Sequence, residues 1–119
     1  MIDAETFADH WIKAWNSHDL EAILGHYAED VIFLSPVAAA RVGTGRVVGL
    51  DALRAYWGAG LAAQPGLEFK LDRILVGYEA LTIQYANHRG QAVAETFEFG
   101  PDGKVVRASA CYDPPIPRP

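Results

Sequence analysis

The feature that most constrains this chain is a change of hydrophobic period at Gln64-Pro65-Gly66. Before this tripeptide, apolar residues recur every three or four positions, as on one face of a helix. After it, they alternate with polar residues, which is typical of strands with one buried face. Proline cannot continue a helical hydrogen-bond ladder and glycine accepts a left-handed turn, so the boundary is sharp. The sequence therefore predicts helices first and a sheet afterwards.

Three helices are predicted in the first half of the chain. The first spans about Asp3 to Trp15, the second begins near His18, and the third follows an N-cap at Asp51. The second helix is expected to run for about three turns, because its apolar stripe continues to Tyr27. A short strand at residues 31–34 follows it directly. The glycine-containing segment 37–49 is predicted to be a mobile loop or a bent hairpin, and function is expected to sit on it.

Four strands are predicted in the second half, joined as an antiparallel meander at residues 67–72, 81–85, 93–99 and 106–112. A three-residue loop at 88–90 aligns Ile83 with Glu95, and a four-residue loop at 100–103 aligns Glu95 with Ala108. Helices that precede such a sheet cover one of its faces, which gives an α+β domain. A twisted sheet that curls around a helix forms a cone, and we expect a small ligand to bind in its open mouth.

Composition narrows the range of functions. A chain of this length, 119 residues, is expected to form one domain over residues 1–119. Its net charge of −5 and its lack of a Lys/Arg cluster argue against a nucleic-acid partner. One cysteine, a start unlike a signal peptide and no apolar run of about 20 residues predict a cytoplasmic protein without a membrane partner. The four histidines lack the spacing of a metal site, so neither a metal nor another cofactor is expected.

Glu95 breaks the pattern of its strand. It shares an apolar face with Phe97 and Phe99, where a carboxylate is out of place. Burial disfavours the charged form and raises the pKa of a carboxyl group, which suits a general base or a neutral hydrogen-bond donor. A structural interpretation competes with this one. It places Glu95 at the rim of the sheet, or pairs it with Arg73, Arg46 or a backbone amide.

Three stretches of the sequence resemble the NTF2-like superfamily, and within it the SnoaL-like branch. They are HDLEAILGHYAEDVIFLSP at 18–36, GLDALRAYW at 49–57 and ETFEFGPDGKVVRASACY at 95–112, and their order and spacing strengthen the resemblance. It implies a cone-shaped α+β barrel, with three N-terminal helices and a curved, mostly antiparallel sheet that enclose a deep pocket. It also implies a homodimer formed through the sheet. Relatives include ketosteroid isomerases, polyketide cyclases, small hydrolases and dehydratases, and non-catalytic binders.

The resemblance also assigns roles to individual residues. The general-base aspartate of ketosteroid isomerases matches Ser35, which cannot take up a proton at neutral pH. Their oxyanion tyrosine matches Trp11, whose indole N–H still donates a hydrogen bond, and their second oxyanion acid matches Glu95. The serine at the base position argues against classical steroid isomerisation. Glu95 and Trp11 are therefore the candidate catalytic residues.

The chain is thus predicted to be a pocket protein for a small apolar or aromatic molecule. Acid/base isomerisation, cyclisation or hydration of that molecule, without a cofactor, is the first hypothesis. The alternative is a non-catalytic ligand-binding or protein-interaction dimer, which would act through an exposed apolar patch. The residues expected to line the pocket are mostly aromatic: Trp15, Tyr27, Phe33, Ser35, Trp57, Tyr85, Phe97 and Tyr112.

Overall fold

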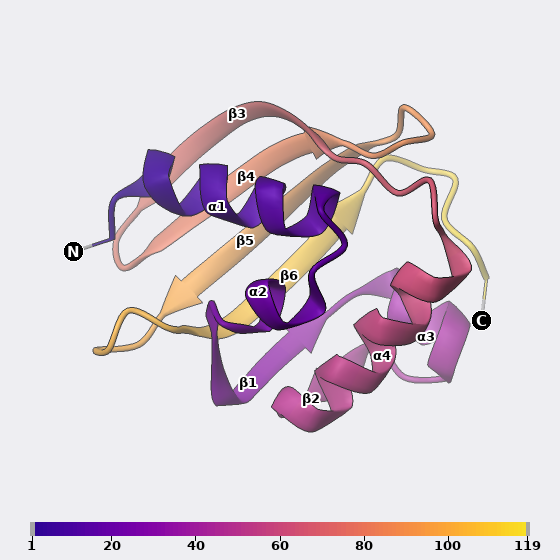
Figure 1. Ribbon diagram of the computed structural model, residues 1–119, viewed down its shortest axis with the longest axis horizontal. Coiled ribbons are helices and arrows are strands. Elements are labelled where there is room, and N and C mark those ends of the chain that lie inside the picture. The colour runs from indigo at the N-terminus through magenta and orange to yellow at the C-terminus, as the bar shows by residue number, and fades with distance from the viewer. Residues whose placement is uncertain (1, 119) are drawn as a thin grey trace.

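The computed structural model describes residues 2–118 as a curved six-stranded sheet with helices packed against its concave face (Figure 1). Helix α1 (Ala4–Asn16) lies along the sheet, and the short helix α2 (Leu20–Leu24) follows it. Asp3 and Asp19 each accept a hydrogen bond from a backbone N–H in the first turn of their helix, as N-caps do. Local capping thus fixes where both helices start.

The second helix is shorter than the sequence predicts. It ends at Leu24, and strand β1 (Tyr27–Leu34) begins after Gly25 and His26, so Tyr27 lies in a strand and not on a helical stripe. Strand β1 pairs with β6 on one side and with β2 on the other. A helix that continued to Tyr27 would leave backbone groups of β6 without partners. Sheet pairing therefore outweighs the local helical pattern.

The segment after β1 is also different from the prediction, because it begins with a helix. Helix α3 (Pro36–Val42) starts at the Ser35 side chain, whose Oγ accepts a hydrogen bond from the Val37 N–H at 3.1 Å. Gly43, with φ of +81°, ends it in the left-handed conformation. Strand β2 (Arg46–Val48) then pairs antiparallel with β1. The predicted mobile loop is thus a capped helix and a short edge strand.

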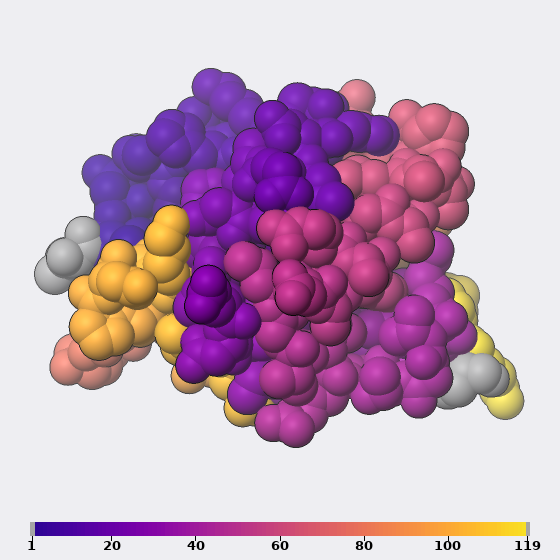
Figure 2. All heavy atoms as spheres, turned by 60° about the horizontal axis from the view of Figure 1, so that its bottom comes forward, coloured from indigo at the N-terminus to yellow at the C-terminus, as the bar shows by residue number. Residues whose placement is uncertain are grey.

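Helix α4 begins slightly earlier than expected. It spans Leu50–Ala63, and Gly49 occupies the N-cap position, so Asp51 lies in the first turn instead of capping the helix. Leu53 and Trp57 are its buried residues and face the core. Figure 2 shows α4 in the middle of the helical side of the molecule, beside the segment of α2 and β1.

The remaining strands form an antiparallel meander, as predicted, but its first strand begins at Lys70 instead of Leu67 and continues to Gly77. They are β3 (Lys70–Gly77), β4 (Ala80–Ala86), β5 (Ala92–Phe99) and β6 (Val105–Tyr112). The order across the sheet is β2-β1-β6-β5-β4-β3, and β1 runs parallel to β6. The first and last strands of the chain are thus paired inside the sheet, and the curved sheet forms the cone that the sequence predicts.

Two predicted hairpin registers position Glu95, and the structure confirms one of them and corrects the other. Ile83 lies opposite Glu95, which confirms the predicted loop at 88–90. On the other side Glu95 lies opposite Ala110 and not Ala108. Phe99 pairs with Val105 instead of Lys104, because the turn is one residue longer than predicted, and an irregularity between Glu98 and Phe99 shifts the register by one more residue. A shift by an even number of residues keeps every side chain on its face, so Glu95 still points inward.

The hydrophobic core fills the space between the helices and the concave face of the sheet. Its largest fully buried side chains include Trp11, Phe97, Ile23 and Leu53. Aromatic residues from α1, β1, α4 and β5 interlock there, with ring centroids 5.1 to 5.3 Å apart at several edge-to-face contacts. Among residues 2–118, no helix is both long and apolar enough to cross a membrane.

Candidate functional site

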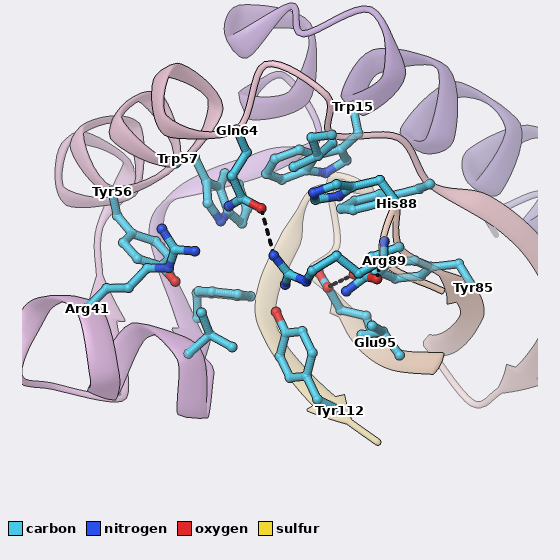
Figure 3. Close-up of a pocket in the computed structure, with 17 residues that line it drawn as sticks. Trp15, Arg41, Tyr56, Trp57, Gln64, Tyr85, His88, Arg89, Glu95 and Tyr112 are labelled. Atoms are coloured by element: carbon cyan, nitrogen blue, oxygen red, sulfur yellow. Dashed lines mark hydrogen bonds between the residues drawn. The ribbon is translucent and has the colours of Figure 1, made fainter. Parts of the chain in front are cut away.

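A cavity of about 100 Å³ opens at the end of the cone near the C-terminal end of α4 (Figure 3). The helices and strands each supply part of its wall, and the 64–69 segment and the loop between β4 and β5 supply the rim. Its lining is mostly aromatic, with a few polar and basic groups: Trp15, Phe33, Val37, Arg41, Tyr56, Trp57, Gly60, Gln64, Leu67, Phe69, Tyr85, Asn87, His88, Arg89, Val93, Glu95 and Tyr112.

Glu95 is the buried acid of this cavity, because its side chain is only 4% exposed. Ile83 and Ala110 flank it on the neighbouring strands, and its only hydrogen bond within residues 2–118 comes from the Tyr85 hydroxyl at 3.3 Å. Burial raises the pKa of the Glu95 carboxyl to about 8, and the Tyr85 hydrogen bond only partly offsets it. No cation pairs with Glu95 in the described part of the chain, including Arg46 and Arg73, so the ion-pair interpretation is wrong.

Four tyrosines, Tyr27, Tyr56, Tyr85 and Tyr112, lie close enough to Glu95 for its charge to affect their hydroxyls, and among them Tyr85 donates a hydrogen bond to it. Burial raises the pKa of each phenol, and the negative charge of an ionised Glu95 raises it further. Their hydroxyls therefore stay protonated at neutral pH and act as hydrogen-bond donors or acceptors rather than as bases. Glu95 is the group among them that changes its charge near neutral pH.

Five of the eight residues expected to line the pocket do so, together with Glu95. They are Trp15, Phe33, Trp57, Tyr85 and Tyr112. Ser35 caps α3 and lies directly behind the lining, beside the Tyr56 and Tyr112 hydroxyls, whereas Phe97 lies in the core against Phe7. Neither is part of the cavity wall.

Trp11 and Tyr27 also lie behind the cavity wall. Trp11 is fully buried, and its Nε1–H donates to the Tyr27 hydroxyl at 2.9 Å. The indole N–H that the resemblance aligns with an oxyanion donor is thus occupied within the protein. Trp11 contacts the wall from the rear, because its ring stacks on Phe69 and packs against Tyr85.

The indole N–H of Trp15, unlike that of Trp11, has no acceptor in the described part of the chain. Its side chain is 6% exposed and lines the cavity, yet its Nε1–H has no hydrogen-bond partner within residues 2–118. Its ring packs edge-on against Trp57 with centroids 5.1 Å apart. A buried donor without an acceptor is costly, and such groups are rare in folded proteins.

The rim of the cavity contains polar residues that sequence reasoning missed. Arg41 comes from the last turn of α3, and Arg89 and His88 come from the β4–β5 loop. Arg89 donates a hydrogen bond to the Gln64 Oε1 at 3.4 Å and so spans the opening (Figure 3). The capping signals of α3 could have indicated where Arg41 lies, whereas the position of Arg89 depends on the tertiary fold.

Among residues 2–118, no group of three or more His, Cys, Asp or Glu side chains is arranged to hold a metal ion. The charged and polar groups of the cavity are few and come from distant parts of the sequence. Its chemistry consists of one buried carboxyl group, neutral phenols and basic groups at the rim.

The comparisons with known proteins agree with this architecture. A family model described as a SnoaL-like domain matches residues 8–111. A SnoaL-like protein of unknown function from Burkholderia thailandensis E264 is 40% identical, with a TM-score of 0.91 over 93% of this chain and 94% of that chain. No curated protein matches the sequence.

Two more distant solved structures share the fold. A proposed isomerase of the SnoaL-like family from Agrobacterium tumefaciens strain C58 is 16% identical, with a TM-score of 0.74 over 93% of this chain and 97% of that chain. TerC, co-crystallised with polyporic acid, is 15% identical, with a TM-score of 0.76 over 92% of this chain and 91% of that chain. At such identities the likeness concerns the fold alone.

Proposed function

This chain belongs to the SnoaL-like family, and we propose that its cavity binds a small, largely apolar or aromatic molecule on which Glu95 performs acid/base chemistry. The observation that carries the proposal is the Glu95 carboxyl, 4% exposed, in a cavity lined by aromatic side chains. A group with a pKa of about 8 can both give and take a proton near neutral pH. Isomerisation, cyclisation or hydration each need such a group.

The tyrosine hydroxyls near Glu95 can stabilise the negative charge that develops when Glu95 removes a proton. When a carboxylate removes a proton from a carbon next to a carbonyl, negative charge develops on the carbonyl oxygen. A neutral hydroxyl such as that of Tyr112 can donate a hydrogen bond to that oxygen, and a water-poor cavity strengthens the interaction. The protonated Glu95 can then return the proton to another atom of the same molecule, which is an isomerisation without a cofactor.

Ser35 and Trp11 take supporting roles in this proposal. Ser35 occupies the sequence position of the isomerase base, but its hydroxyl caps α3. Trp11 holds the Tyr27 hydroxyl through its indole N–H, so we assign it as a positioning residue rather than a group that touches the ligand. The acid/base role therefore rests on Glu95 alone.

Hydrogen–deuterium exchange tests the proposal without knowledge of the natural substrate. The probe is phenylacetone, whose carbon acid lies beside both a carbonyl and an aromatic ring. We expect the wild-type protein to accelerate exchange in D₂O, measured by NMR, and Glu95→Gln to slow it by about 100-fold or more. Glu98→Gln is the matched control, because Glu98 lies on the same strand and pairs with Arg107 on the outer face. Equal exchange by wild type and Glu95→Gln would rule out the acid/base role.

A homodimer through the sheet is the second proposal. The outer face and edge of the sheet expose large apolar side chains, including Leu75 at 48% and Val76 at 75%. Leu75 pairs with Thr82, whose hydroxyl contacts Thr96 at 2.8 Å, so short side chains lie beside Leu75 on this face. Such a surface suits a second copy of the chain. Light scattering should give a dimer mass that Leu75→Asp reduces to a monomer mass and that Val42→Asp, an exposed change on α3, leaves unchanged.

A further inference from the structure

Two arginines at the rim of the cavity have no acidic partner. Arg41 and Arg89 come from different elements and both line the opening (Figure 3). Within residues 2–118 neither forms an ion pair, whereas Arg54 and Arg107 do so elsewhere on the surface. Two guanidinium groups are thus available to a bound molecule.

The charge at this opening is opposite to that of the whole chain. The chain carries a net charge of −5, but the rim carries two cations, and the one acid that lines the cavity is Glu95. Buried Glu95, with its raised pKa, is mostly protonated at pH 7 and does not neutralise them. The positive charge of Arg41 lowers the pKa of Tyr56 and Tyr112 against the larger effect of burial, so its field reaches into the cavity. A cavity with one sign of charge attracts ligands of the other sign.

The wall of the cavity sets a second requirement for the ligand. The Trp15 N–H is buried and has no acceptor among the described residues, although its side chain lines the cavity. A ligand that carries oxygen atoms can supply the missing acceptor, and a pure hydrocarbon cannot. Both the rim and the wall therefore favour a molecule with oxygen acceptors.

The size of the cavity limits the apolar part of the ligand. A cavity of about 150 Å³ accommodates benzene in another protein, and this one measures about 100 Å³ with the Arg89–Gln64 hydrogen bond in place. The cavity is therefore too small for a fused-ring system, so we take a single ring as the apolar part of the ligand. The aromatic wall around Trp57 and Tyr85 suits the ring.

Taking the proposed small-molecule function as its basis, we infer that the cavity selects a small one-ring aromatic carboxylic acid, whose carboxylate lies between Arg41 and Arg89. A guanidinium group matches a carboxylate with two parallel hydrogen bonds, which fixes the orientation of the acid. The ring then points inward, toward Glu95 and the tyrosines. Neutral molecules of the same shape make the ring contacts but lose the contacts at the rim.

Isothermal titration calorimetry at pH 6.5 tests this inference with matched pairs of acids and amides. The pairs are benzoate and benzamide, phenylacetate and phenylacetamide, and 3-phenylpropanoate and 3-phenylpropanamide. We expect at least one acid to bind 10-fold or more tightly than its amide, because each good charge-assisted contact contributes that much. Arg41→Gln together with Arg89→Gln should abolish the preference, and Arg107→Gln should leave it intact.

Three outcomes would overturn the inference. Equal affinity for an acid and its amide would remove the anion preference while leaving a working pocket. An acid preference that survives in the double variant would place the anion elsewhere. Lack of binding by all six compounds would exclude one-ring acids. The phenylacetone exchange assay uses a neutral probe, so its result decides the proposed acid/base function separately from this experiment.

Discussion

The concave side of the sheet holds two aromatic clusters with similar composition and different polar contacts. We call the first the closed cluster, formed by Phe7, Trp11, Tyr27, Phe97 and Phe99. The second is the open cluster, which surrounds the cavity and is formed by Trp15, Trp57, Phe69, Tyr85 and Tyr112. They touch where Trp11 packs against Phe69, Tyr85 and Trp15, and where Tyr27 packs edge-on against Trp57.

The two clusters differ in how their polar atoms are satisfied. In the closed cluster, the Trp11 N–H and the Tyr27 hydroxyl bond to each other at 2.9 Å. In the open cluster, the Trp15 N–H has no partner within residues 2–118, and Glu95 receives one long hydrogen bond from Tyr85. Aromatic content therefore does not distinguish a core from a binding site here. Unsatisfied polar atoms do, because a stable core satisfies its own hydrogen bonds.

The largest expected difference between the clusters concerns packing. Phe97 is fully buried in the closed cluster and contacts Phe7 and Trp11, so Phe97→Ala should lower the free energy of unfolding by about 3–5 kcal/mol. Phe69, in the open cluster, is only partly buried, and Phe69→Ala should cost about half as much or less. Urea denaturation of both variants measures the two values. Equal losses would mean that the open cluster is part of the rigid core.

The next effect concerns the charge of Glu95. Its pKa of about 8 in the folded protein lies above the ordinary 4.5, so the folded state holds a proton that the unfolded chain releases. This stabilisation is full below pH 4.5 and is lost as the pH rises through about 8. From pH 5.5 to pH 8.5, wild type should lose about 3 kcal/mol of stability relative to Glu95→Gln.

Neighbouring groups do not mask this effect. Tyr27, Tyr56, Tyr85 and Tyr112 have raised pKa values and stay neutral in this pH range. Glu98→Gln removes a carboxylate on the outer face and should reproduce the wild-type pH dependence. Parallel stability curves for wild type and Glu95→Gln would show that Glu95 is solvated in solution.

A matched pair of tryptophan substitutions isolates the contribution of the Trp11–Tyr27 hydrogen bond to stability. Trp11→Phe removes the donor to the buried Tyr27 hydroxyl, whereas Trp15→Phe removes a donor without a partner. Both changes delete the same atoms, so their shared loss of volume cancels in the comparison. Trp11→Phe should therefore lower the free energy of unfolding by about 1–2 kcal/mol more than Trp15→Phe does, as measured by thermal and urea unfolding. The reverse order would remove the distinction between the two clusters.

The inward position of Glu95 could be predicted from the sequence because strand alternation and loop length are local properties. The three-residue loop at 88–90 aligned Ile83 with Glu95 correctly, and the later shift in the β5–β6 pairing was even. Alternation fixes the face on which a side chain lies but says nothing about its distance from the open end of the cone. Alternation therefore assigns Phe97 to the pocket together with Tyr85, although the structure places Phe97 in the closed cluster and only Tyr85 in the cavity wall.

The rim could not be predicted, for two different reasons. Arg41 lies on α3, whose Ser35 cap and terminal Gly43 are recognisable signals, but its glycines and small residues favoured a loop. Arg89 lies in a hairpin loop, and only the curvature of the sheet brings that loop to the end of α4. Local patterns report capping and alternation, whereas the meeting of distant loops depends on the whole fold.

The smallest expected effect concerns access to the open cluster. Gln64 accepts the Arg89 hydrogen bond across the opening at 3.4 Å, a long and solvent-exposed contact. Gln64→Ala should change the free energy of unfolding by less than about 0.5 kcal/mol. The same change should raise the association rate of phenylacetate a few-fold, because Arg89 no longer has to break this contact before the ligand enters.

Stopped-flow fluorescence of Trp15 and Trp57, which line the cavity, follows this association directly. Gln84→Ala is the control, because Gln84 lies on β4, where it pairs with Arg73 of β3, and is absent from the cavity wall. A faster association in Gln64→Ala alone identifies the Arg89–Gln64 contact as the barrier to entry. Unchanged rates in both variants would show that the opening is wide enough without it. The two clusters would then differ only in hydrogen bonding and not in access.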